Sequence, residues 1–172
     1  MLLSILTLVS STVEDAAAAY WSHPLPMHPK LVHVPMALCI LMPMIAIMIW
    51  LGVRRGWFTP RVWLIAAVLQ GATLCGGLAA LKTGGDDGAL VEGYASEEAL
   101  ATHEARAHWF LYVAGANLVL CGVTVLQRER IRQQLLGAIA IVGLFAGSYA
   151  GYRVGDAGGR LVYVGNASDA HR

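Results

Sequence analysis

Four apolar runs, each close to the roughly 20 residues that a helix needs to cross a bilayer, divide the chain. They cover residues 31–53, 62–81, 108–126 and 134–152. None of them shows the period-2 alternation of a barrel strand. Because lipid offers the backbone no hydrogen bonds, apolar runs of this length are helical. The pattern therefore predicts an all-α fold, a four-helix transmembrane bundle.

Charged residues between the runs predict the orientation of this bundle. The middle segment, residues 82–106, holds six carboxylates against Lys82 and Arg106. The other two links are short and basic, and short basic links stay in the cytoplasm. We therefore expect both termini and the middle segment outside, an N-out/C-out topology. The arginines of the two basic links are Arg54, Arg55, Arg61, Arg128, Arg130 and Arg132.

The topology divides the chain into three parts. Residues 1–27 form an outward N-terminal segment, either an atypical signal peptide or an interfacial segment. Residues 28–156 form the four-helix membrane domain, and residues 157–172 form an outward C-terminal tail. The whole chain has 172 residues, of which 57% are hydrophobic and 13% charged, with a net charge of +1. This composition predicts a membrane protein in contact with lipid, and no nucleic-acid partner.

Histidines gather at the predicted outer ends of the first and third spans. His28 and His33 begin the first span, His103 and His108 begin the third, and His23 precedes them all. The remaining histidine, near the C-terminus, is not expected to take part. Ionisable groups at one depth of a membrane bundle indicate function more often than isolated ones do.

Two imidazoles on separate helices, each above small residues, are the arrangement that a bis-histidine haem b requires. Helical phase favours His33 and His108 as axial ligands of the haem iron, with His28 and His103 as substitutes. The small residues are Ala37 below His33 and Gly115 below His108. Arg106 is the expected partner of the propionates. The leading hypothesis is therefore a haem b protein that relays electrons near the outer face.

Two other functions stay open. The glycines of the fourth span recur every four residues, a pattern typical of close helix packing, so the protein could be a cofactor-free accessory subunit of a larger membrane complex. Alternatively, imidazoles and carboxylates could bind copper or zinc. The ligands would come from His23, His28, His33, His103, Asp86, Asp87 and Glu104.

The remaining motifs limit the choice of function. Cys39, Cys75 and Cys121 are isolated in apolar runs, and the chain contains no CxxC motif, so we expect small buried side chains there. Asn117 lies on the opposite side of its helix from His108, which favours interhelical hydrogen bonding. The sequence shows no nucleophile–base pair and no phosphate-binding loop, so we expect no catalytic activity of its own.

Two short motifs carry a family resemblance. HPKLVHVPMAL opens the first span, and GGRLVY, residues 158–163, follows the fourth. With these motifs the chain, from His28 to Val164, resembles a bacterial family of four-span membrane proteins, domain-of-unknown-function family 2231. The family often continues with His-Gly, whereas this chain has Val164, Gly165 and Asn166. The resemblance implies the bacterial inner membrane. By association it implies a respiratory role beside other membrane subunits, with quinol or a periplasmic cytochrome as redox partner.

Overall fold

The computed structural model describes residues 27–91 and 94–165, which are helical almost throughout. The helices are α2 (Met27–Leu31), α3 (His33–Arg54), α4 (Trp63–Val91), α5 (Glu97–Leu126) and α6 (Arg130–Tyr163), with a 3-10 helix η1 (Pro60–Val62) before α4. Four of the described stretches are long and apolar enough to cross a membrane: Met27–Arg54, Pro60–Gly88, Glu97–Leu126 and Arg130–Tyr163. The prediction of an all-α bundle with four spans is confirmed.

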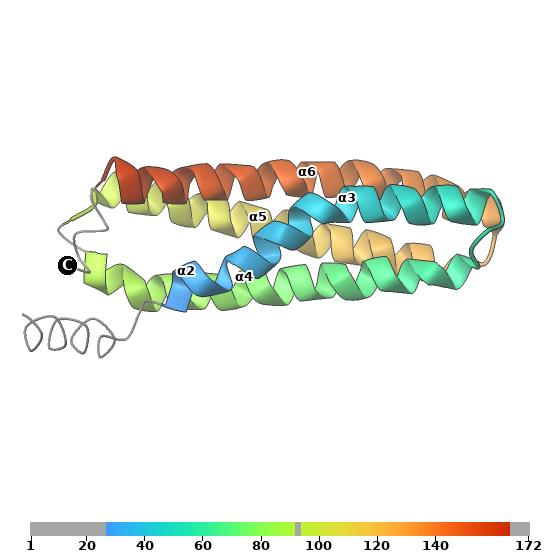
Figure 1. Cartoon of the computed structure of the whole chain (residues 1–172), viewed down its shortest axis with the longest axis horizontal. Coiled ribbons are helices and arrows are strands. Elements are labelled where there is room, and N and C mark those ends of the chain that lie inside the picture. The colour runs from blue at the N-terminus through green and yellow to red at the C-terminus, as the bar shows by residue number, and fades with distance from the viewer. Residues whose placement is uncertain (1–26, 92–93, 166–172) are drawn as a thin grey trace, which may run out of the picture.

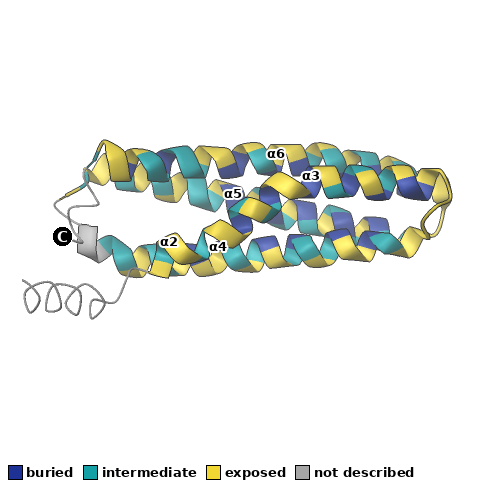
Figure 2. Cartoon of the chain, in the orientation of Figure 1, coloured by how far each residue is buried: buried dark blue, intermediate teal, exposed yellow. Residues whose placement is uncertain are grey.

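The four long helices run alternately up and down (Figure 1). Helix α3 packs against α4 and α6, and α5 packs against α4 and α6. Helix α2 lies beside α4, and α3 crosses the bundle obliquely until it runs along α6 at the other end (Figure 1). The exposed residues follow the outward faces of all four helices (Figure 2). Many of these residues are large and apolar, among them Ile40, Val68, Val119 and Val142, and they contact lipid in a membrane.

The two ends of the bundle differ in their side chains. One end contains His28 and His103, and we call it the histidine end. The opposite end, the arginine end, contains the six arginines of the two basic links, all of them exposed. Residues 1–26, which include His23 and the possible signal or interfacial segment, lie outside the described residues. The N-out/C-out orientation stays a prediction, since the fold alone does not say which end faces the cytoplasm.

Three helices are longer than the apolar runs that predicted them. Helix α4 continues to Val91 and α5 begins at Glu97, so most of the predicted middle loop is helical. Helix α6 continues to Tyr163, through the first part of the predicted tail. Hydropathy shows only how long the apolar run is. The helix continues past the run because its backbone hydrogen bonds do not require apolar side chains. Ser96 is the N-cap of α5, since its Oγ accepts a hydrogen bond of 3.3 Å from Ala99 N.

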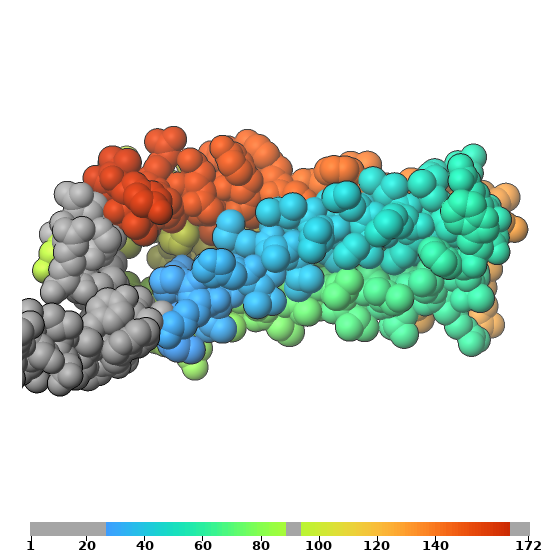
Figure 3. Space-filling view, in the orientation of Figure 1, coloured from blue at the N-terminus to red at the C-terminus, as the bar shows by residue number. Residues whose placement is uncertain are grey.

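The apolar core is larger toward the arginine end. A cluster around Met42, Ile49, Trp63 and Leu144 fills that half of the bundle. Toward the histidine end the core consists of a smaller cluster of Cys39, Phe110 and Ala150. Because α2 and the start of α3 lean on α4, they leave α5 and α6 partly uncovered there. Figure 3 shows the surface hollowed between the first residues of α2 and α3 and the end of α6.

The glycine ladder of α6 faces the interior of the bundle. A Cβ on Gly143 would overlap Asn117 Oδ1, and one on Gly147 would lie 3.1 Å from Asn117 Nδ2. A Cβ on Gly151 would lie 2.7 Å from Cys39 Sγ, and one on Gly155 would lie 2.9 Å from Met36 Cε. The ladder therefore lets α3 and α5 approach α6 closely, as the four-residue spacing indicates.

Candidate functional site

His28 is held by two hydrogen bonds to α4. Its backbone N–H donates to Asp87 Oδ2 at 3.0 Å, and its ring Nδ1 lies 2.8 Å from the carbonyl oxygen of Ala80. A carbonyl only accepts hydrogen bonds, so Nδ1 carries the proton in this contact and Nε2 is left as the basic nitrogen. Gly84 lies beside the ring, where a Cβ would come within 3.0 Å of it. His28 is therefore a half-buried, oriented imidazole with one free lone pair.

His103 approaches the same place from α5. Its ring is half-buried, and its Nδ1 atom is buried without a hydrogen-bond partner. Gly158 of α6 lies against this ring, since a Cβ there would be 3.2 Å from His103 Cε1. A buried imidazole nitrogen without a partner is costly, which makes it a position where a ligand would be stabilising.

The two imidazoles contact each other across the histidine end. Their ring centroids are 6.1 Å apart, and their planes are at 89°. One ring belongs to the first half of the chain and the other to the second half, so the contact depends on the fold and not on spacing along one helix. Sequence analysis gave His28 and His103 only as substitutes for the preferred axial ligands. The fold brings these two histidines into contact.

The preferred axial ligands of the sequence analysis, His33 and His108, do not take part in this contact. His33 and Ala37 are exposed on α3. His108 is half-buried on α5, with its ring Nδ1 3.1 Å from the carbonyl oxygen of Glu104 in the preceding turn. A Cβ on Gly115 would meet no atom within 4 Å, so the small residues Ala37 and Gly115 do not form a shared slot inside the bundle. Axial ligation by His33 and His108 stays a prediction that the geometry does not favour.

Arg106 lies one turn from His103 and faces α6. Its Nη1 atom donates to the carbonyl oxygen of Arg153 at 3.1 Å and pairs with Asp156 Oδ2 at 3.4 Å. Asp156 also pairs with Arg160 at 3.3 Å. Two guanidinium groups thus share one carboxylate, which leaves positive charge at this end of α6.

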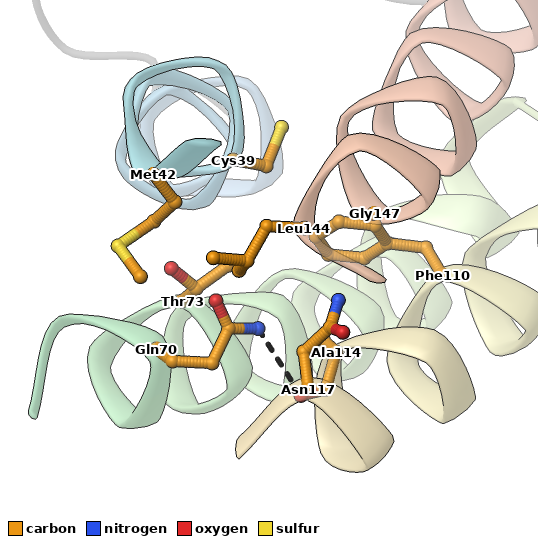
Figure 4. Close-up of a pocket in the computed structure, with 9 residues that line it drawn as sticks. All are labelled: Cys39, Met42, Gln70, Thr73, Phe110, Ala114, Asn117, Leu144 and Gly147. Atoms are coloured by element: carbon orange, nitrogen blue, oxygen red, sulfur yellow. Dashed lines mark hydrogen bonds between the residues drawn. The ribbon is translucent and has the colours of Figure 1, made fainter. Parts of the chain in front are cut away.

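A second polar site lies in the middle of the bundle (Figure 4). Gln70 Nε2 donates to the carbonyl oxygen of Ala114 at 3.1 Å, and Asn117 Nδ2 donates to that of Gly143 at 2.8 Å. These bonds join α4 to α5 and α5 to α6, as predicted for Asn117. The cavity beside them measures about 10 Å³, the room that one water molecule needs. It is too small for an organic cofactor.

The copper or zinc hypothesis has limited support in the fold. No group of three histidine, cysteine or acidic side chains that could hold a metal ion occurs within residues 27–91 and 94–165. Asp87 contacts the backbone of His28, while His23 lies outside the described residues. Sequence reasoning did not connect Gly84 or Gly158 with the histidines, because neither glycine lies in a motif that contains one; Gly158 entered only as the first residue of GGRLVY.

Comparison with known proteins identifies the family and nothing more specific. The family model described as "Predicted membrane protein (DUF2231)" matches residues 24–170. No curated protein and no solved structure matches the chain. The match covers most of the 172 residues and both histidines of the contact pair. The chain belongs to the DUF2231 family of predicted membrane proteins.

Proposed function

We propose that this multi-pass membrane protein binds haem b between His28 and His103 and relays electrons at the histidine end. The observation that carries the proposal is the contact between the two rings, 6.1 Å from centroid to centroid. Imidazoles that bind one metal ion from opposite sides, each at about 2 Å, have their centroids about 6 Å apart. The separation in the fold agrees with this requirement.

The surroundings of the two rings support haem over a bare ion. A haem brings four nitrogens of its own, so two axial imidazoles complete six-coordinate iron, which suits electron transfer and not oxygen chemistry. The carbonyl of Ala80 holds the His28 ring in one orientation and directs Nε2 away from α4. Gly84 and Gly158 let their helices pack directly against the two rings, because a Cβ on either glycine would touch the imidazole beside it. The surface is hollowed between α2 and the end of α6, at the same end of the bundle (Figure 3).

The membrane location follows from the charge distribution. With six arginines at the arginine end, that end is cytoplasmic and the histidine end faces outward. In a bacterial inner membrane, the histidine end would face the periplasm. A haem there would exchange electrons with quinol, another membrane subunit or a periplasmic cytochrome. The haem would lie at one end of the spans, so the protein alone would not carry electrons across the whole membrane.

A second candidate function is a cofactor-free accessory subunit. Gly115 and Gly122 lie seven residues apart on α5, and a Cβ on either would meet no atom within 4 Å. Glycines that are open to the outside of a membrane helix let another helix approach closely. This surface, defined by Gly115 and Gly122, favours association with a partner subunit, and such an association is compatible with haem as well as with its absence.

An absorption spectrum of the protein purified from haem-replete cells tests the proposal. We expect a Soret band, split α and β bands after dithionite reduction, and a pyridine haemochromogen of the b type. His28→Ala and His103→Ala should each lose most of the bound haem, and added imidazole should restore part of it. The matched controls are His33→Ala and His108→Ala, which should keep the spectrum.

Two results would contradict the proposal. A wild-type protein without any haem signal under these conditions would favour the accessory-subunit function. Loss of haem in His33→Ala and His108→Ala, with retention in His28→Ala and His103→Ala, would keep the cofactor but refute the site. Circular dichroism of each variant separates loss of a ligand from loss of fold.

A further inference from the structure

A groove runs along the surface between α5 and α6, close to the histidine end. Its volume is about 360 Å³, and it is open to the outside of the bundle. Ala105 and Ala150 are the small side chains in its lining, so the groove exists because neither helix carries bulk there. The larger lining side chains that bear on its chemistry are Arg106, Trp109, Tyr149 and Arg153.

Positive charge is in excess around this groove. Arg153 Nη1 donates to the Tyr149 hydroxyl at 3.0 Å, and the guanidinium lies 5.8 Å from the centre of the Tyr149 ring. Within the described part of the chain, Arg153 forms no ion pair with a carboxylate, and Arg106 shares Asp156 with Arg160. Three guanidinium groups therefore face one carboxylate, and the hydrogen bonds of Arg153 leave several of its N–H donors free.

The groove changes from charged to apolar along the helix axes. Trp109 and Tyr149, which are 63% and 60% exposed, lie one turn further from the histidine end than the two arginines. The next large exposed side chains toward the middle of the membrane are Tyr112 on α5 and Phe145 on α6. Exposed tryptophan and tyrosine mark the interfacial depth of a bilayer. Along the groove, charged, aromatic and apolar side chains follow one another in the same order as the phosphate, glycerol and acyl chains of a phospholipid.

We infer that this groove binds an anionic phospholipid of the leaflet at the histidine end. Arg106 and Arg153 donate hydrogen bonds to the phosphate oxygens, since the planar guanidinium group matches the geometry of phosphate. The acyl chains lie over Tyr112 and Phe145. The excess of positive charge selects a headgroup with net negative charge over a zwitterionic one.

This inference does not depend on the haem, because the groove lies on the outward surface of α5 and α6 and includes neither His28 nor His103. Arg106, the expected partner of the propionates, is the one residue named for both. Arg153→Gln is the first variant to test, since it leaves the histidine pair and Arg106 unchanged. Its side chain is exposed, so the fold should tolerate the change. Arg128→Gln is the matched control, because it removes one exposed arginine at the arginine end. Equal thermal unfolding of the two variants would confirm that both are folded.

Native mass spectrometry of the full chain in detergent, titrated with phosphatidylglycerol or phosphatidylcholine, measures the affinity for each lipid. We expect the first phosphatidylglycerol to bind at least about tenfold more tightly than phosphatidylcholine. Arg153→Gln and Arg106→Gln should each weaken this binding about fivefold, the effect of removing one cation near a lipid headgroup. Arg128→Gln should not weaken it. Ala105→Phe should also reduce binding, because it fills the groove without changing charge.

Three results would overturn the inference. Equal binding of the two lipids would show that the groove does not select negative charge. Equal behaviour of Arg153→Gln, Arg106→Gln and Arg128→Gln would place the lipid elsewhere. Displacement of phosphatidylglycerol by millimolar inorganic phosphate would identify a site for free phosphate and not for lipid.

Discussion

A close approach of three helices, at Gly151, yields a testable prediction about packing. A Cβ at this position would lie 2.7 Å from Cys39 Sγ on α3 and 3.5 Å from Phe110 Cε2 on α5. Cys39 cannot give way freely, since its Sγ donates to the carbonyl oxygen of Met36 at 3.1 Å and the residue is buried. Gly151→Ala should therefore separate α3 from α6 or break that hydrogen bond.

The magnitude follows from a comparison of two glycines. Overpacking a tight core costs about 1–3 kcal/mol, while alanine in place of glycine stabilises a helix by about 1 kcal/mol. Gly115→Ala should gain only the helix stabilisation, because a Cβ there meets no atom within 4 Å and causes no overpacking. We expect Gly151→Ala to be less stable than Gly115→Ala by about 1–3 kcal/mol, the packing term alone.

Unfolding by SDS in mixed micelles, followed by far-ultraviolet circular dichroism, measures this difference. Cys39→Ala removes the atom that the new Cβ would strike, so the double variant Cys39→Ala/Gly151→Ala should recover about 1 kcal/mol or more in a double-mutant cycle. If Gly151→Ala were as stable as Gly115→Ala, the close approach of α3 to α6 would be wrong. A cycle without coupling would show that Cys39 is not the side chain in the way.

Two further predictions concern orientation and the polar middle of the bundle. In a background without native cysteines, a membrane-impermeant maleimide should label Glu98→Cys but not Arg130→Cys on intact cells, and the opposite labelling would reverse the topology. Asn117→Leu removes the 2.8 Å hydrogen bond to Gly143 and should lower stability by about 0.6–2 kcal/mol, whereas the exposed control Val119→Leu should not. Equal unfolding midpoints for these two variants would mean that the interhelical bond contributes no net stability.

The sequence alone determined the membrane character of the protein and the number of its spans. A helix must be about 20 apolar residues long to cross the hydrocarbon, and a backbone in lipid must bond to itself, so four such runs permit one kind of fold. The glycine ladder from Gly143 to Gly155 was also visible in the sequence, because a four-residue spacing places small residues on one face.

Only the tertiary structure decided which histidines meet. Sequence reasoning favoured His33 and His108 from their positions on single helices, but both faces of a membrane helix are apolar, since lipid is as apolar as a protein core. The hydrophobic pattern therefore could not say which face turns inward. The fold pairs His28 with His103, because α2 leans on α4 through Asp87 and Ala80 while α5 packs against α6. Contacts between distant segments depend on helix tilt and rotation, which local spacing does not specify.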